Sequence, residues 1–266
     1  MQFESDDALT LMALGILAFA IANISHEALG HGLAALAAGA KPELLTTCYV
    51  ETVGSTSRWI PAGGGIANVM VGFLSLLSLC TLRPNSPRAY YFLVLVVAFN
   101  LFFASGYPAY SGIAAFGDWA AVISPLTPHW LWRGVLVFVS VVCYYLSMEV
   151  VAWIIRPFGS SRQPEALARL RRATLIPYLA ALAAAGLAGA SNPRGWTVIF
   201  TSALPAAAAA FGLTQIDHFR RSTSPDPLVP AAGPITRSPG WIAAAALVFV
   251  FFVAVLGPGI RFSAHQ

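Results

Sequence analysis

Residues 25 to 32, SHEALGHG, place two histidines and a glutamate inside one long apolar run. Imidazole nitrogens are common zinc ligands, and a neighbouring glutamate can act as general base, as in the helical H-E-x-x-H signature. Here His26 and His31 are five residues apart instead of four. On a regular α-helix this spacing points the two rings about 140° apart, so both reach one ion only if the helix is distorted. A π-bulge, which absorbs one extra residue, is the expected distortion, and Gly30 makes it easier.

Other ionisable residues lie in or beside apolar runs, where they cost free energy unless they face the bundle interior or a water-filled cavity. Asp118 and Glu149 are the further examples. A reading without a metal is that His26 makes a polar contact while Glu27 and His31, four residues apart, pair with each other. For Glu149, a hydrogen bond between helices or near the cytoplasmic end of its helix is favoured over a substrate or proton path.

The elements that must position these residues are membrane helices. The chain has 266 residues, of which 58% are hydrophobic and 10% charged, and this composition is typical of an integral membrane protein. The apolar runs lack the alternation of a membrane barrel, so they predict helices. We expect an all-α polytopic membrane protein with about seven transmembrane helices, six being the fallback. The runs cover residues 8–38, 61–82, 89–106, 130–155, 173–190, 196–215 and 241–257.

The segment between the first two spans is polar and rich in β-branched residues. Residues 45–53 alternate between two faces, which predicts a short strand or re-entrant segment ending in a turn at Gly54 and Ser55. An edge strand beside a polar pocket could hold an extended peptide by strand addition. An ordinary extracytoplasmic loop is an equally good reading of this segment.

Basic residues indicate the orientation, because short cytoplasmic loops carry an excess of them. Placing the N-terminus in the cytoplasm puts ten of the fifteen Lys and Arg residues there. The first seven residues contain Glu4, Asp6 and Asp7, so we expect no cleavable signal peptide. The expected location is the bacterial plasma membrane, with the lipid bilayer as surroundings. The loops explain the net charge of +4, and no nucleic-acid partner is expected.

Two linkers divide the chain into a front part, residues 1–155, and an alanine-rich part, residues 156–266. Residues 156–172 are the most charged stretch and predict a cytoplasmic surface helix, whereas the proline-rich residues 216–240 predict an extended loop. We expect His129 and Arg133 to be interfacial, and Asp217 and His218 to be solvated. The three cysteines have no metal-site or redox spacing.

The cluster of His26, Glu27 and His31 resembles the site-2 protease family of intramembrane zinc metallopeptidases. GGGIAN, residues 63–68, is similar to the family's Gly-Pro-x-x-Asn segment, with glycine where proline is usual. Residues 100–119 are similar to its Asn...Pro...Asp-Gly segment, although here the segment is longer and Trp119 stands where glycine is expected. The resemblance covers about residues 20 to 120 and implies that Asp118 is a third metal ligand. HEALGH is also similar to the zinc motif of the dipeptidyl peptidase III family, which is soluble.

A catalytic zinc needs three protein ligands and one open position for water. His26, His31 and Asp118 supply such a set, and Glu27 would take a proton from the water and pass it to the leaving amine.

The expected function is therefore hydrolysis of peptide bonds in membrane-embedded proteins or peptides. Asn68 and Asn100 could bind the peptide or a developing oxyanion, although a buried asparagine more often bridges two helices. One alternative is a noncatalytic metal-binding membrane protein. Another is a proton-coupled transporter, which predicts inverted repeats or paired broken helices that this sequence lacks. The sequence predicts neither the oligomeric state nor the physiological substrate.

Overall fold

The computed structural model describes residues 6–82, 84–159, 164–219 and 232–262. Within these ranges, seven helical segments are long and apolar enough to cross a membrane, which confirms an all-α polytopic membrane protein. The segments are Ala8–Ala37, Trp59–Leu82, Pro87–Ala114, His129–Ile154, Pro164–Ala190, Trp196–Gln215 and Pro239–Leu256.

Three of the seven segments change helix type along their length. The first consists of α1 (Ala8–Ile24), η1 (Ser25–Gly32) and α2 (Leu33–Ala37). The sixth consists of α8 (Trp196–Val198), η3 (Ile199–Ala203), α9 (Leu204–Ala210) and η4 (Phe211–Gln215), and the last of α10 (Pro239–Phe251) and η5 (Phe252–Leu256). The uninterrupted helices are α3 (Trp59–Leu82), α4 (Pro87–Ala114), α6 (His129–Ile154) and α7 (Pro164–Ala190). Two short helices, α5 (Asp118–Ile123) and η2 (Arg156–Phe158), lie in connections.

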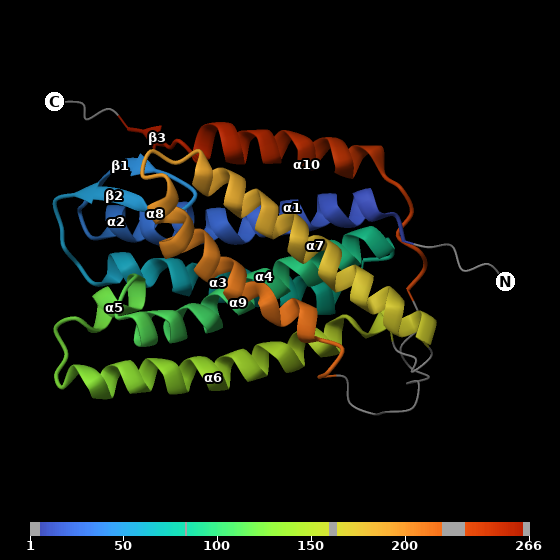
Figure 1. Cartoon of the computed structure of the whole chain (residues 1–266), viewed down its shortest axis with the longest axis horizontal. Helices are drawn as coiled ribbons and strands as arrows, with labels where there is room; N and C mark the ends of the chain where they lie inside the picture. Colours follow the sequence, from blue (N-terminus) through green and yellow to red (C-terminus); the bar gives the residue numbers. More distant parts are fainter. Residues whose placement is uncertain (1–5, 83, 160–163, 220–231, 263–266) are drawn as a thin grey trace.

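In Figure 1, α1, α6 and α10 run roughly along the long axis of the molecule, and α7 and the α8–α9 segment cross it obliquely. Helix α4 lies within the bundle, in contact with α1, α3, α6 and α9. In the interior the ring of Phe19 meets those of Phe99, Phe103 and Phe252 edge to face. These four rings come from α1, α4 and η5, so both parts of the chain contribute to one core. Gly15 of α1 also packs tightly on Pro177 of α7, where an added Cβ would lie 2.6 Å from the proline Cα.

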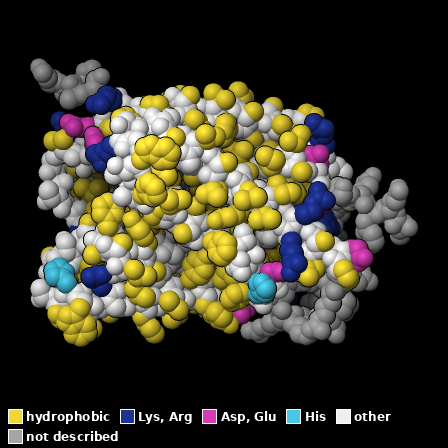
Figure 2. All heavy atoms as spheres, viewed as in Figure 1, with side chains coloured by type: hydrophobic (Ala, Val, Ile, Leu, Met, Phe, Trp, Pro, Cys, Tyr) yellow, Lys and Arg dark blue, Asp and Glu magenta, His cyan; other side chains and the backbone are white. Residues whose placement is uncertain are grey.

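The outer faces of α3 and α6 carry large apolar side chains, including Phe73 and Phe138. In Figure 2, hydrophobic side chains cover the middle of the visible face, and charged side chains lie toward its two ends. This distribution suits a protein whose flanks contact lipid and whose ends contact water.

A small sheet closes one end of the bundle. Strands β1 (Lys41–Leu45) and β2 (Val50–Val53) pair antiparallel, and β3 (Ile260–Arg261) adds to the other edge of β1. The prediction of one strand over 45–53 is wrong, because the chain reverses between Leu45 and Val50. The hydroxyl of Thr46 accepts hydrogen bonds from the backbone amides of Cys48 and Tyr49 and so stabilises the reversal. Where a turn was expected at Gly54 and Ser55, the chain bends at Gly54, which has φ of +106°.

The two linkers also differ from expectation. The charged stretch does not form a separate surface helix, because its second half is the beginning of α7, which continues to Ala190. Arg169 in this first part of α7 is held by two hydrogen bonds to the buried carboxylate of Asp6, at 2.9 and 3.0 Å. Of the proline-rich loop, residues 220–231 lie outside the described residues, and residues 232–238 have no regular secondary structure.

Of the four residues expected at the interface or in solvent, His129 is exposed at the start of α6, whereas Asp217 and Arg133 differ from expectation. Asp217 is not solvated, because its side chain is 8% exposed and forms an ion pair with Arg171 at 2.9 Å. Arg133 does more than lie at an interface, since its guanidinium donates to the carbonyls of Gly112 and Ile113 at the end of α4. His218 is exposed, as predicted.

Candidate metal centre

The segment Ser25–Gly32 is a π-helix within an otherwise α-helical span. In a π-helix the backbone hydrogen bond runs from i to i+5, so residues five apart come to nearly the same face. The rings of His26 and His31 accordingly lie 4.8 Å apart between centroids, at 88° to each other. The predicted departure from α geometry is confirmed.

The π-helix packs directly on α3 through glycines. A Cβ on Gly30 would lie 2.5 Å from the Cα of Gly64 and 2.6 Å from the carbonyl oxygen of Gly63. A Cβ on Gly64 would lie 2.5 Å from Nε2 of His26. The glycine run that opens α3 therefore leaves room for both the distorted turn and one imidazole.

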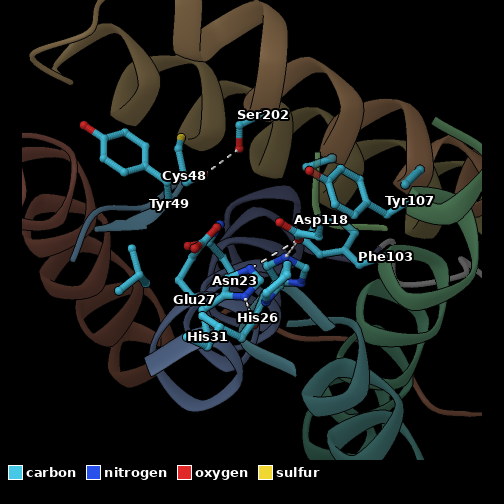
Figure 3. A pocket seen from close by; sticks show the side chains of 15 residues that line it. Asn23, His26, Glu27, His31, Cys48, Tyr49, Phe103, Tyr107, Asp118 and Ser202 are labelled. Atoms are coloured by element: carbon cyan, nitrogen blue, oxygen red, sulfur yellow. Dashed lines mark hydrogen bonds and ion pairs between the residues drawn. The ribbon is translucent and has the colours of Figure 1, made fainter. Parts of the chain in front are cut away.

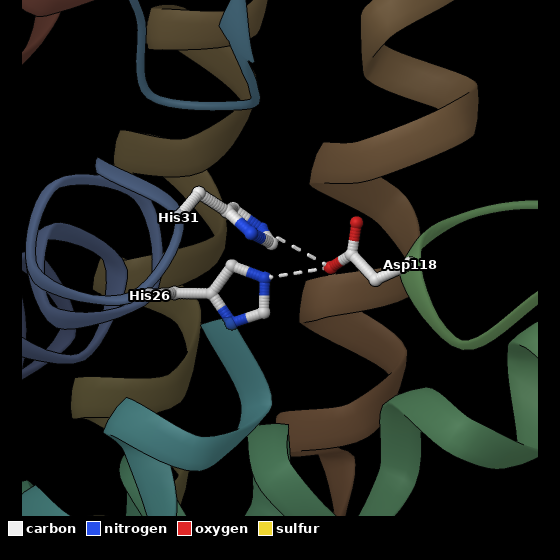
Figure 4. A group of neighbouring side chains, drawn as sticks. All are labelled: His26, His31 and Asp118. Carbon is white, nitrogen blue, oxygen red and sulfur yellow. Dashed lines mark hydrogen bonds and ion pairs between the residues drawn. The ribbon is translucent and has the colours of Figure 1, made fainter. Parts of the chain in front are cut away.

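Asp118 meets both histidines at the first residue of α5 (Figure 4). Its Oδ2 lies 3.0 Å from Nε2 of His26 and 3.2 Å from Nε2 of His31. One ligand atom from each residue can be chosen so that all three lie within 4.8 Å of one another. Two ligands about 2.1 Å from one tetrahedral zinc lie about 3.4 Å apart, so this spacing fits a metal site.

Hydrogen bonds fix which nitrogen of each imidazole faces Asp118. The side-chain nitrogen of Asn68 donates to the carbonyl of Ala22 and to Oδ1 of Asn100, so its oxygen is left to accept from Nδ1 of His26 at 2.7 Å. Nδ1 of His31 donates to the carbonyl oxygen of Ile60 at 2.8 Å. In its neutral form each ring therefore carries its proton on Nδ1 and presents an unprotonated Nε2 to the cluster, which is the form that binds a metal. When Nε2 instead donates to Asp118, the ring carries a proton on both nitrogens and is charged.

The two asparagines do not line the cavity beside the cluster. Asn68 and Asn100 are fully buried between helices, and the amide of Asn100 also donates to the carbonyl of Val96. Their predicted contact with a peptide or oxyanion is therefore corrected. Both side chains instead hold the imidazole of His26 in place, which is the helix-bridging role weighed for them from sequence.

Glu27 lies next to the cluster without being part of it. The residue is 5% exposed, and among the described residues its Oε2 has no hydrogen-bond partner. Figure 3 shows the carboxylate pointing into the cavity beside the His26–Asp118 pair. His31 pairs with Asp118, so the structure does not contain the four-residue pair of Glu27 with His31 considered from sequence.

The cavity that these residues border has a volume of about 190 Å³. Its other walls come from the turn of the β1–β2 hairpin, from α4, and from η3 and α9 (Figure 3). Ser202, Ala206 and Ala209 of the last two elements were not expected near the site. Small residues in an alanine-rich helix carry no sequence signal for such a position.

Asp118 and Cys48 line the cavity and lie outside the spanning segments, and their protonation follows from their surroundings. Burial raises the pKa of the Asp118 carboxyl, but the charge of His31 and the hydrogen bonds from both imidazoles outweigh it, so the net pKa is lowered. Asp118 is therefore ionised at neutral pH, as a metal ligand must be. Burial raises the pKa of the Cys48 thiol to about 11, so this cavity residue stays protonated.

Glu149, the remaining ionisable residue singled out from sequence, is not in the cavity. It lies on α6, partly buried, and accepts a hydrogen bond from the hydroxyl of Tyr145 at 2.9 Å. This contact fits the hydrogen-bonded reading favoured for it.

Comparisons of the chain with protein-family models, with curated proteins and with solved structures gave no match.

Proposed function

We propose that this protein is an intramembrane zinc metallopeptidase that hydrolyses peptide bonds of membrane-embedded substrates. The observation that carries the proposal is the convergence of His26, His31 and Asp118 beside the buried carboxylate of Glu27, whose Oε2 has no hydrogen-bond partner among the described residues. Two imidazoles and a carboxylate are a common ligand set of catalytic zinc, which keeps one position open.

The hydrogen bonds around the two histidines leave their Nε2 atoms available to bind zinc. Both Nε2 atoms are unprotonated in the neutral rings, because Asn68 and the Ile60 carbonyl engage the two Nδ1 atoms. Zinc held there would polarise a water and lower its pKa toward neutrality. Glu27, whose Oε2 has no hydrogen-bond partner in the described part of the chain, would accept the proton of that water and deliver it to the leaving amine.

The surroundings of the cavity suit an extended apolar peptide. Phe103, Ile60 and Ala206 supply apolar walls. In the sheet order β2–β1–β3, strand β2 has one unpaired edge, and its Val50 borders the cavity. We propose that the substrate backbone pairs with this edge by strand addition.

The orientation belongs to the same proposal. The metal cluster lies near the end of the bundle that carries α5 and the sheet, and the chain begins at the opposite end (Figure 1). In the topology expected from the sequence, ten of the fifteen basic residues lie on the same side of the membrane as the N-terminus, so the cavity would open toward the extracytoplasmic side of a bacterial plasma membrane.

The test is cleavage of single-span membrane peptides, reconstituted with the purified protein in phospholipid vesicles. We expect cleavage that a chelator abolishes and added zinc restores. Glu27→Gln, which keeps size and removes the proton acceptor, should reduce the rate by about 10²- to 10⁴-fold. Glu149→Gln is the matched control and should leave the rate unchanged, because Glu149 lies outside the cavity.

Three outcomes would contradict the proposal. Cleavage by the Glu27→Gln variant at the original rate would show that Glu27 is not the general base. A metal-loaded wild type that cleaves none of the peptides would favour the noncatalytic metal-binding protein. A wild type that binds no metal would contradict both of these readings and favour the proton-coupled transporter.

A further inference from the structure

Tyr107 of α4 is a cavity residue to which neither the metal site nor the proton transfer assigns a role. Its ring contacts the ring of His26 edge to face, with centroids 5.8 Å apart, and stacks on Tyr110 at 5.7 Å. In Figure 3 the hydroxyl of Tyr107 points into the cavity on the Asp118 side of the cluster, and Glu27 lies on the other side.

The chain makes room for this hydroxyl at Gly117. This residue has φ of +87°, and a Cβ there would lie 2.6 Å from the hydroxyl oxygen of Tyr107. The hydroxyl therefore lies beside the backbone that leads directly into the ligand Asp118. A glycine at this position serves both the left-handed backbone conformation and the close approach of the tyrosine.

The hydroxyl still has its proton to donate. The backbone amide of Asp118 interacts with the phenolic oxygen, which thereby acts as an acceptor. Among the hydrogen bonds of the described residues, none has this hydroxyl as its donor, whereas Tyr90, Tyr91 and Tyr144 all donate to backbone carbonyls. A tyrosine hydroxyl is one donor and one acceptor, so a ligand oxygen in the cavity can take the remaining bond.

We propose that Tyr107 donates a hydrogen bond to the oxyanion that forms from the substrate carbonyl oxygen. This inference rests on the proposed peptidase function and assigns the oxyanion donor that Asn68 and Asn100 cannot supply from their buried positions. Donors aimed at the charge that develops in the transition state are a major source of catalysis.

The proton and electron movements balance without a further reactant. The water oxygen bonds to the carbonyl carbon, the π electron pair moves to the carbonyl oxygen, and Glu27 takes the water's proton. When the pair returns, the C–N bond breaks, its electrons leave with the nitrogen, and Glu27 gives the proton to that nitrogen. Tyr107 keeps its own proton throughout and stabilises the charged intermediate by its hydrogen bond.

Tyr107→Phe tests the donor, because it removes the hydroxyl and keeps the ring contacts with His26 and Tyr110. We expect kcat for a cleaved membrane peptide to fall by about 10²- to 10³-fold, with KM and zinc content unchanged. Tyr110→Phe is the matched control. It changes the stacked partner in the same helix, does not line the cavity, and should retain wild-type kinetics.

A second measurement does not depend on turnover. A phosphonate analogue of the peptide carries a tetrahedral anion in place of the scissile amide, and its affinity for the zinc-loaded protein can be measured by calorimetry. We expect Tyr107→Phe to weaken phosphonate binding by about 10²-fold and to leave binding of the uncleaved amide peptide unchanged.

The outcomes separate this inference from the proposed function. If the wild type cleaves peptide, and Tyr107→Phe matches it in both kcat and phosphonate affinity, the donor role is overturned while the peptidase stands. If the wild type cleaves nothing, the peptidase fails, and the phosphonate still decides whether Tyr107 donates to an anion. A wild type that does not bind the phosphonate, or a phenylalanine variant that loses its zinc, would also overturn the donor role.

Discussion

Oδ1 of Asn68 lies 2.7 Å from Nδ1 of His26, although 42 positions separate the two residues in the chain. The amide nitrogen of Asn68 is already used by the Ala22 carbonyl and by Asn100, so this contact can only be N–H of histidine to O of asparagine. It fixes the ring so that Nε2 faces Asp118. One buried side chain of α3 thus decides how a residue of the first span meets the proposed metal.

Replacing Asn68 with alanine should weaken zinc binding by about 10- to 100-fold, the usual cost of losing the partner that orients a histidine ligand. Zinc titration of the purified apoprotein measures this. Asn23→Ala is the control, because it also removes a side-chain amide hydrogen bond, the partly buried one to the Thr47 carbonyl, in which neither histidine takes part. Equal loss of affinity in both variants would contradict the positioning role of Asn68.

Gly64→Ala should also weaken zinc binding, by about 10-fold or more, because the new Cβ would lie 2.5 Å from Nε2 of His26 and would displace the ring. Gly186→Ala in α7 is the matched control, since an added Cβ there meets nothing within 4 Å. Both variants can be compared by zinc titration and by circular dichroism. A Gly64→Ala variant that is folded and binds zinc like the wild type would show that the ring is not confined by α3.

Deleting Ala28 changes HEALGH to HELGH, with the histidines four residues apart. Because the π-helix already absorbs one extra residue, the deletion should convert it to α-helix and leave the flanking turns in register. We expect stoichiometric zinc to be retained. Deleting Ala20 within the regular α1 should instead rotate its two flanks by about 100° relative to each other and abolish zinc binding. Loss of zinc on deletion of Ala28 alone would contradict this account of the spacing.

The sequence predicted well the features that depend on composition or residue spacing along the chain. Long apolar runs mark the spans, because the bilayer requires them whatever the helices pack against. The distortion between His26 and His31 was also predictable, since their spacing cannot serve one ion on a regular helix.

The features that were missed depend on three-dimensional contacts. The hairpin reverses at residues 46–49, where the Thr46 hydroxyl accepts hydrogen bonds from two backbone amides. The alternating sequence pattern does not predict these hydrogen bonds. Asn68 and Asn100 were predicted to contact the substrate, but both are fully buried. Their burial results from the packing of α3 and α4, which the sequence does not show. The wall formed by Ser202 and Ala206 was missed because nothing in their sequence context distinguishes them from neighbouring residues.

Arg169 and Arg171, two residues apart in α7, should differ in their effect on stability. Arg169→Ala removes both hydrogen bonds to the Asp6 carboxylate, which is 3% exposed, and should lower the free energy of unfolding by about 3–5 kcal/mol. Arg171→Ala should cost about 1 kcal/mol or less, because Arg171 is 60% exposed. Reversible unfolding in mixed detergent micelles measures both values. Similar losses for the two variants would contradict the structural role of the Asp6–Arg169 pair.

The central claim is that His26, His31 and Asp118 hold one zinc ion. Elemental analysis of the purified protein, with the His31→Ala and Asp118→Ala variants prepared in parallel, tests it most directly. We predict about one zinc per wild-type chain and loss of zinc from both folded variants, with Glu149→Ala retaining it. A wild-type protein that lacks stoichiometric metal after zinc loading, or folded His31 and Asp118 variants that keep their zinc, would contradict the account.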